Sequence, residues 1–169
     1  MKRRLTRLFC ALAFCALPLC WPTPAPAQFF GGAAIDGIKC ESMEGSAQHV
    51  HTHLQIFDKG RALTIPASVG IPLGMDCLYW VHTHSNDGLI HIESPVKRAF
   101  TLGDFFDIWG QDLSTSTAGP VHGRHLRVTV NGKPYTGDPR RIVLADHQEI
   151  VIQNGPPFGH PVKYDWGTM

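Results

Sequence analysis

Polar and apolar side chains alternate along residues 48–57, and this alternation is the most regular pattern in the chain. The odd-numbered positions carry His49, His51 and His53, whereas the even-numbered positions carry apolar or β-branched side chains. A period of two predicts a β-strand, because successive side chains of a strand point to opposite faces. The Asp-Lys-Gly sequence at residues 58–60 then predicts a hairpin turn that leads into a second, shorter strand.

Other short segments predict further strands. They are expected at residues 78–84, 89–93, 126–130, 141–144 and 149–153. Asn131-Gly132 is the strongest hairpin signal in the chain, because a type I′ turn needs positive φ angles at both of its central residues. The segments 141–144 and 149–153 are expected to pair with each other across the polar residues between them.

Residues 102–109 change the period from that of a strand to that of a helix. Their apolar side chains occupy positions i, i+3, i+4 and i+7, which predicts one short amphipathic helix. Thr101 is the expected N-cap, with Asp104 three residues later, and Gly110 is the expected end. The elements together predict a mostly β fold with one short helix, and a sandwich, a partly open barrel and a β-grasp-like sheet all fit them.

The first 27 residues have the pattern of a secretory signal peptide. A basic start is followed by an apolar run from Leu8 to about Cys20 and then by a small-x-small cleavage sequence that ends at Ala27. We expect cleavage there and a mature chain, residues 28–169, that forms a single histidine-rich β domain. The apolar run is too short for a membrane span and no second one follows, so we expect a periplasmic or secreted protein without a transmembrane segment.

Removal of this leader changes the charge of the chain. Four of the 15 basic residues leave with it and none of the 14 acidic residues does, which leaves 11 basic against 14 acidic residues, a net charge of −3 with neutral histidines. All ten histidines remain in the mature chain. A mildly acidic chain without a basic stripe is not expected to bind nucleic acid.

Cysteine usage fits export. Three of the five cysteines lie in the leader, so that only Cys40 and Cys77 remain. An even pair in an oxidising compartment predicts a disulfide, which stabilises a loop of this length by about 3–4 kcal/mol in the chain-entropy model. The alternative is that both thiolates bind a metal ion.

The segment YWVHTHSNDGLIHIESP adds three histidines and a glutamate within twelve positions. If Asp87-Gly88 is a two-residue type I′ turn, His84 lies opposite His91, and His82 lies opposite Glu93. Residues directly opposite each other in an antiparallel pair share a face, so this register places all four side chains together. The other face then receives an apolar, β-branched set that is suited to a core, whereas a three-residue turn would mix the two faces.

Imidazole and carboxylate groups at this spacing predict a metal site. The predicted ligands are His49, His51, His53, His82, His84, His91 and Glu93. These ligand types suit zinc, copper and iron alike, so they do not identify the metal, and the two histidine tracts can form one site or two. Glu93 can be a ligand or can orient a histidine, Asp87 is expected to be a turn residue, and Glu44 is a weaker carboxylate candidate.

Other chemistries find no support in the sequence. The chain contains no G-x-S-x-G, P-loop, G-x-G-x-x-G or H-E-x-x-H motif. The remaining histidines are expected to be ordinary surface or hydrogen-bonded residues: His122, His125, His147 and His160.

Three segments, HVHTHLQIFDKGRALTIPASVGI, CLYWVHTHSNDGLIHIESP and TLGDFFDIWGQ, resemble a group of small exported bacterial proteins of uncharacterised function. The resemblance covers roughly residues 38–155, and its most specific part is the HTH…DG.IHIE block. It implies export and a metal-type histidine cluster, and it implies no particular activity. The chain is also faintly similar to cupins, but Glu93 follows His84 by nine positions, whereas the first cupin motif places its glutamate three or four residues after the His-x-His.

These observations support three functional hypotheses. The first is an exported metal-binding protein that handles copper, zinc or iron, with the metal ion as its partner. The second is an extracytoplasmic metalloenzyme of oxygenase or hydrolase type, in which an open coordination position activates O₂ or water in a pocket walled by Tyr79, Trp80 and the strand around His51. The third is a structural or adhesion domain whose histidines bind nothing in particular. The sequence does not indicate a protein partner.

Overall fold

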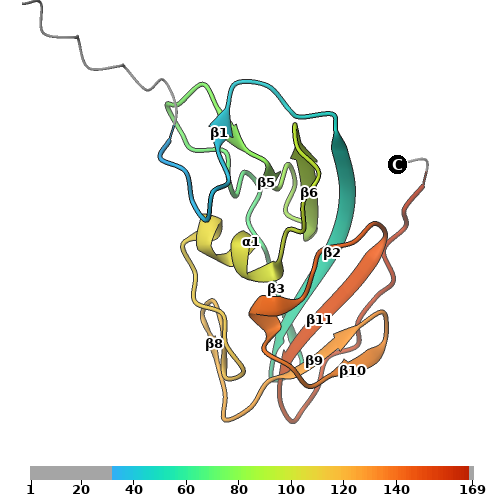
Figure 1. Cartoon of the computed structure of the whole chain (residues 1–169). Coiled ribbons are helices and arrows are strands. Elements are labelled where there is room, and N and C mark those ends of the chain that lie inside the picture. The colour runs from blue at the N-terminus through green and yellow to red at the C-terminus, as the bar shows by residue number, and fades with distance from the viewer. Residues whose placement is uncertain (1–31, 168–169) are drawn as a thin grey trace, which may run out of the picture.

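The computed structural model describes residues 32–167, and these residues form mostly β-strands with one short α-helix (Figure 1). The strands are β1 (Cys40–Glu41), β2 (Gln48–Asp58), β3 (Arg61–Leu63), β4 (Leu78–Tyr79), β5 (Val81–His82), β6 (Leu89–Ser94), β7 (Thr117–Ala118), β8 (Val121–His122), β9 (Arg127–Val130), β10 (Lys133–Tyr135) and β11 (Gln148–Asn154). The helices are α1 (Leu102–Trp109) and the 3-10 turn η1 (Pro139–Arg141). The predicted leader, residues 1–27, lies outside the described residues.

Seven of the strands form one mixed sheet in the order β10-β9-β11-β2-β6-β5, with β3 also paired to β2. β1 with β4 and β7 with β8 form two small separate pairs. The sheets are open rather than closed into a barrel, so the predicted mostly β class with one short helix is confirmed, and the arrangement is consistent with a β-sandwich. Within residues 32–167 no helix has the length and apolar character that a membrane span requires.

β2 is the central strand of the sheet and the longest, with 11 residues. Along one edge its first half pairs antiparallel with β6 and its last residues pair with β3, while β11 runs parallel along the other edge (Figure 1). The predicted Asn131-Gly132 hairpin between β9 and β10 is confirmed, with φ angles of 50° and 74° at its two turn residues.

The predicted strand at residues 141–144 is reduced to a single β-bridge, between Val143 and Thr101, and it does not pair with β11. The 3-10 turn η1 ends at Arg141, and the carboxylate of Asp138 accepts a hydrogen bond from the backbone N–H of Arg140 at 3.0 Å. A proline with a preceding Asp cap favours a helical turn over a strand. β11 pairs instead with β9 and, in parallel, with β2, which lies more than 90 residues earlier in the chain.

The helix α1 agrees with its prediction. Thr101 and Asp104 form a reciprocal capping box, and the helix ends at Gly110, whose φ angle of 70° is left-handed. The helix buries Phe105 and Phe106 in the same apolar core as Ile90 and Ile92 of β6. The apolar face of the sheet therefore packs toward α1, which leaves the opposite face of β2 and β6 for polar side chains.

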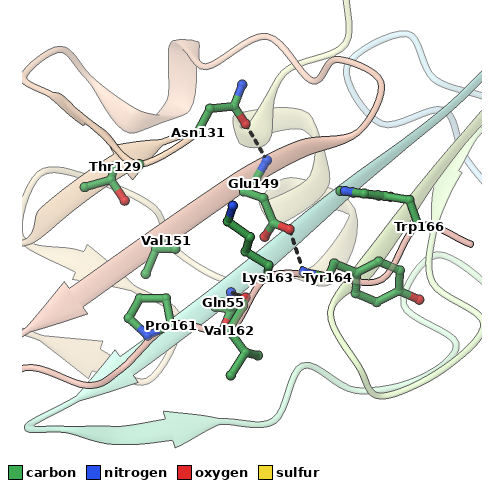
Figure 2. A pocket seen from close by; sticks show the side chains of 11 residues that line it. Gln55, Thr129, Asn131, Glu149, Val151, Pro161, Val162, Lys163, Tyr164 and Trp166 are labelled. Carbon is green, nitrogen blue, oxygen red and sulfur yellow. Dashed lines mark hydrogen bonds between the residues drawn. The ribbon is translucent and has the colours of Figure 1, made fainter.

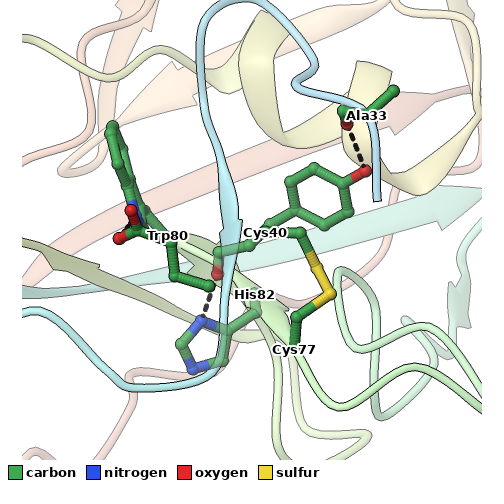
Figure 3. The surroundings of a disulfide bond; sticks show 7 residues. Ala33, Cys40, Cys77, Trp80 and His82 are labelled. Atoms are coloured by element: carbon green, nitrogen blue, oxygen red, sulfur yellow. Dashed lines mark hydrogen bonds between the residues drawn. A yellow bond between two sulfur atoms is a disulfide. The ribbon is translucent and has the colours of Figure 1, made fainter. Parts of the chain in front are cut away.

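The predicted disulfide between Cys40 and Cys77 is present (Figure 3). It joins β1 to the start of β4, where Cys40 lies opposite Tyr79. The Tyr79 hydroxyl donates to the Ala33 carbonyl at 2.7 Å, and the Trp80 indole N–H donates to a carboxylate oxygen of Glu41 at 2.8 Å. These contacts hold the segment before the first histidine tract against the strand that leads into the second.

Candidate metal centre

The polar face of the sheet brings histidines from three strands together. In the β2–β6 pair His51 lies opposite His91 and His49 lies opposite Glu93, and in the β5–β6 pair His82 lies opposite His91. Directly opposite residues of antiparallel strands share a face, so these side chains project to one side. The alternate residues Val81, Ile90 and Ile92 project to the other side and are completely buried in the core.

The predicted register of the β5–β6 hairpin is wrong by two residues, because His82 rather than His84 lies opposite His91. β5 ends at His82, and the backbone of Thr83 bonds to Val69 at 3.0 Å and to Ser68 at 2.9 Å instead of to β6. A shift by two residues exchanges partners but not faces. The grouping of the histidines and Glu93 on one face therefore survives the different register.

The predicted two-residue type I′ turn is not formed: residues 83–88 join β5 to β6, and of Asp87 and Gly88 only Gly88 has a positive φ angle. A carboxylate oxygen of Asp87 accepts hydrogen bonds from the backbone N–H of Leu89 at 3.0 Å and from the Ser85 hydroxyl at 2.6 Å, so Asp87 is a turn residue, as expected. Gly88 has a φ angle of 86°, and a Cβ there would lie 2.3 Å from the carbonyl oxygen of Leu54. Only glycine fits this close approach of the turn to β2.

Two groups of four donors lie on this face. The first consists of His49, His51, His91 and Glu93, and the second consists of Glu44, His82, His84 and Glu93. Within each group one ligand-type atom from every residue lies within 4.8 Å of the others. Either set, three imidazoles with one carboxylate or two of each, suits zinc, copper or iron.

The first group is centred on one oxygen of Glu93. Its Oε1 atom lies 3.0 Å from Nε2 of His49 and 3.8 Å from Nδ1 of His91. The Nε2 atoms of His49 and His51 are 3.2 Å apart. Alternate residues of one strand and their cross-strand partners thus converge without distortion of the backbone.

The second group uses the other oxygen of the same carboxylate. Oε2 of Glu93 lies 3.4 Å from Nε2 of His82, which in turn lies 3.1 Å from Nε2 of His84. Nε2 of His84 is 3.6 Å from a carboxylate oxygen of Glu44. Each His-x-His tract therefore supplies a pair of imidazoles to one group, and Glu93 belongs to both.

The tautomer of His82 is set by its backbone contact. Nδ1 of the imidazole donates to the backbone carbonyl of Tyr79, three residues earlier in the chain, at 2.8 Å (dashed line in Figure 3). In the neutral ring Nε2 then carries a lone pair that points toward Glu93 and His84. A backbone carbonyl that fixes the distal ring nitrogen is the usual second contact of a metal-binding histidine.

Two buried polar atoms of the cluster have no hydrogen-bond partner among the described residues. They are Nδ1 of His91 and Oε2 of Glu93, one in each group. A buried polar atom without a partner destabilises the folded state by about 1–3 kcal/mol, and more if it is charged. Coordination of these atoms to a cation would remove that cost.

Burial shifts the pKa values of three histidines of the cluster in the direction that favours metal binding. Loss of solvent lowers the pKa of His82 to about 4 and that of His91 to about 3, and the neighbouring His84 contributes to both shifts. Burial also lowers the pKa of His51. These rings are neutral at physiological pH and keep a lone pair for a metal. Burial, with the nearby Glu44, raises the pKa of Glu93.

His53 lies outside both groups, although it belongs to the first histidine tract. Its Nδ1 atom lies 2.8 Å from a carboxylate oxygen of Glu149 on β11, and its Nε2 atom lies 3.1 Å from the Asp87 carbonyl. Both ring nitrogens are occupied, so we leave His53 out of the proposed ligand set. Glu149 lies opposite His53 in the parallel β11–β2 pair, which the sequence pattern did not predict.

The position of Glu44 beside the second group is the feature of the site that the sequence predicted least well. It lies between β1 and β2, and its side chain is 51% exposed. The next residue, Gly45, donates its N–H to the Glu93 carbonyl at 3.3 Å, and a Cβ there would lie 2.1 Å from the backbone N of Pro95. Gly45 thus lets the Glu44 segment approach β6, and a glutamate followed by glycine was the one available signal.

The four histidines outside the two tracts, His122, His125, His147 and His160, are all exposed. A cavity of about 520 Å³ lies on the same side of the sheet as the histidines, between β9, β11 and the C-terminal segment (Figure 2). Glu149 borders it and accepts a hydrogen bond from the Tyr164 backbone N–H at 2.7 Å. None of the donors of the two groups lines this cavity, so it is separate from the candidate metal centre.

No protein-family model matches the chain, and the searches of curated proteins and of solved structures return no match either.

Proposed function

We propose that this is an exported metal-binding protein that holds a divalent transition-metal ion, copper, zinc or iron, on the histidine face of its sheet. One observation carries the proposal: within each of two groups, imidazole and carboxylate donors from separate segments, some buried and some at the exposed edge, lie within 4.8 Å of one another. Imidazoles so close together do not stabilise one another unless they share a cation or a proton. The low pKa values of His82 and His91 argue against an added proton and keep these rings neutral, with lone pairs that a cation can use.

The same observation disfavours a purely structural role for the histidines. A histidine kept only for packing or surface polarity has its ring nitrogens hydrogen-bonded, as those of His53 are. In the cluster, Nδ1 of His91 and Oε2 of Glu93 are buried without such partners. The cluster thus has unused donor atoms at its centre, which is typical of a ligand site.

Export is part of the proposal and is supported by the disulfide. A Cys40–Cys77 bond is stable in an oxidising compartment and is rare in the cytosol. A signal peptide over residues 1–27, cleaved near Ala27, would deliver the chain to the periplasm or to the outside of the cell. The resemblance to small exported bacterial proteins points in the same direction.

Metal content of matched variants tests the binding function. The mature protein, purified from an oxidising compartment and desalted, is expected to retain zinc or copper in stoichiometric amount. The double variant His49→Ala/His84→Ala removes one half-exposed donor from each group. We expect it to lose the bound metal and to keep the circular dichroism spectrum of the wild type. His125→Ala, at an exposed histidine outside the cluster, is the control and should match the wild type. Equal metal in the wild type and the double variant would contradict the proposal.

A metalloenzyme of oxygenase or hydrolase type is the second candidate function. It is favoured by the exposed edge of the cluster, where the side chains of His49 and His84 are 58% and 45% exposed. An ion held there can keep a coordination position for water or O₂. We place it second because none of the cluster donors lines the 520 Å³ cavity. In addition, two of the expected walls of a substrate site, Tyr79 and Trp80, are buried in the core.

A further inference from the structure

The geometry points to two metal ions on this face, joined by the carboxylate of Glu93, so that the protein holds a dinuclear centre. This inference rests on the proposed metal-binding function and extends it. The first ion would be bound by His49, His51, His91 and Oε1 of Glu93. The second would be bound by His82, His84, Glu44 and Oε2 of Glu93. Carboxylate-bridged pairs of metal ions, about 3.5–4 Å apart, are a recurrent form of metal centre in proteins.

The two oxygens of Glu93 are already divided between the two groups. Oε1 lies nearest to the first group, 3.0 Å from Nε2 of His49, and Oε2 lies nearest to the second, 3.4 Å from Nε2 of His82. One ion shared by all of the histidines would have to draw donors from both sides of the carboxylate. The observed division suits one ion on each oxygen.

The spacing of the donors supports two compact shells rather than one large one. In a tetrahedral zinc site with bonds of about 2.0–2.1 Å, neighbouring ligand atoms are about 3.3 Å apart. The two His-x-His pairs come close to this value, with Nε2 atoms 3.2 Å apart for His49 and His51 and 3.1 Å apart for His82 and His84. The distances from the Glu93 oxygens to Nε2 of His49 and to Nε2 of His82 are 3.0 Å and 3.4 Å, one below and one above this tetrahedral spacing.

The two groups are adjacent. The ring of His91, from the first group, lies with its centroid 5.6 Å from that of His82 and 4.7 Å from that of His84, both from the second. Two cations in adjacent groups repel each other, and a shared anionic carboxylate lowers that repulsion. Glu44 supplies the fourth donor of the group that has only two imidazoles.

The unpartnered buried atoms are an independent indication of two positions. Nδ1 of His91 lies on the first side of the cluster and Oε2 of Glu93 lies on the second. A single ion at the first group would leave Oε2 of Glu93 without a partner, and a single ion at the second would leave Nδ1 of His91 without one. Two ions use both atoms.

Stoichiometry in single-site variants tests the inference. Metal-free protein is titrated with Zn²⁺, and the bound ion is counted by elemental analysis after desalting. The wild type is expected to bind two equivalents, and His49→Ala and His84→Ala one equivalent each. We expect the affinity for the lost ion to fall by about 100-fold or more, since disturbing even an outer contact of a ligand costs about 10–100-fold. His125→Ala is the control and should bind two.

Magnetic coupling tests the bridge itself. With two equivalents of Cu²⁺, spins joined through one carboxylate are expected to couple, so that the electron paramagnetic resonance intensity per copper falls and a half-field transition appears. In His49→Ala and in His84→Ala the single remaining Cu²⁺ is isolated, so its full signal is expected to return. Both variants truncate half-exposed side chains, and a circular dichroism spectrum like that of the wild type verifies the fold.

The outcomes separate this inference from the proposed function. One equivalent in the wild type overturns the dinuclear centre and leaves the binding function in place. Two equivalents with the full, uncoupled copper signal overturn the bridge through Glu93. Zn²⁺ binding no stronger in the wild type than in the double variant His49→Ala/His84→Ala overturns the inference and the binding function together.

Discussion

Nε2 of His82 lies 3.4 Å from Oε2 of Glu93, and both residues are buried on the polar face of the sheet. The backbone contact of His82 leaves Nε2 without a proton, so two lone pairs face each other where solvent cannot reach them. Such a contact costs free energy in the metal-free protein and becomes favourable when a cation lies between the atoms. This contact therefore raises the affinity for a metal ion and lowers the stability of the metal-free protein.

Glu93→Gln should separate these two effects. We expect metal affinity to fall by on the order of 100-fold or more, because the variant loses the charged donor common to both groups. The metal-free variant should unfold at the same temperature as the metal-free wild type or higher, because a buried charge with an unpartnered oxygen is removed. Zn²⁺ titration and thermal unfolding measure the two quantities.

Glu149→Gln is the matched control for that variant. It makes the same chemical change at the carboxylate that lies beside His53, outside both groups. Its metal content should equal that of the wild type. If both variants lost metal equally, His53 and Glu149 would belong to the site after all.

The metal-free protein should lose stability as the pH falls from about 6.5 to about 4. The pKa of His82 is about 4 in the folded state against 6.5 in the unfolded chain, so between these values the unfolded chain binds more protons. For His82 alone the loss is about 3 kcal/mol. His91, with a folded-state pKa of about 3, acts in the same direction.

Glu93 acts in the opposite direction, because burial raises its folded-state pKa and the folded chain then holds its proton more tightly. Two histidines with large downward shifts outweigh one carboxyl group, so the net result is acid destabilisation. Urea unfolding of chelator-treated protein between pH 4 and pH 7.5 measures it. His82→Gln should flatten the pH dependence, and an equally steep profile in that variant would refute the assignment to His82.

Loss of the disulfide should weaken both the fold and the metal site. Replacing Cys40 and Cys77 with serine should lower the free energy of unfolding by about 3–4 kcal/mol, given the separation of 37 residues between them. Metal affinity should fall too, since Glu44 lies four residues beyond Cys40 and depends on that anchor. Urea unfolding and Zn²⁺ titration of the double serine variant test both effects, and a variant with wild-type affinity would show that the position of Glu44 does not depend on the disulfide.

Gly88→Ala should destabilise the protein far more than Gly132→Ala. Both glycines have positive φ angles, 86° and 74°, so alanine is strained at either position by about 1–2 kcal/mol. Only at Gly88 would the added Cβ also meet backbone, the Leu54 carbonyl at 2.3 Å, whereas nothing lies within 4 Å at Gly132. We expect about 3 kcal/mol or more for Gly88→Ala from strain and overpacking together, measured by urea unfolding. An equal loss of unfolding free energy in the two variants would mean that the segment at Gly88 can move away from β2 and avoid the clash.

The export prediction has a direct readout. The full chain, expressed in a bacterium with a periplasm, should be recovered from that compartment with Gln28 as its first residue by mass spectrometry. A chain that starts at Gln28 behind an added methionine should stay in the cytoplasm with Cys40 and Cys77 reduced. Recovery of the full-length chain with residues 1–27 still attached would contradict the predicted cleavage.

Local pattern alone determined several features of this protein. The alternation at residues 48–57 identified β2 and the face that carries its histidines, and the capping residues Thr101 and Gly110 identified both ends of α1. The even pair Cys40 and Cys77 identified the disulfide. These features depend on contacts between near neighbours, or on which residue types are present, and both can be read without knowing how distant segments meet.

The tertiary structure decided which residues meet. The hairpin register, the parallel pairing of β11 with β2 and the approach of the Glu44 segment to β6 all depend on segments far apart in the chain. The alternation of polar and apolar residues shows which face of the sheet a side chain lies on, but not which residue it pairs with. A shift of the pairing register by two residues changes every partner and leaves every side chain on the same face. His53 therefore shares a face with the cluster, but its neighbour across the sheet is Glu149 rather than another donor of the metal centre.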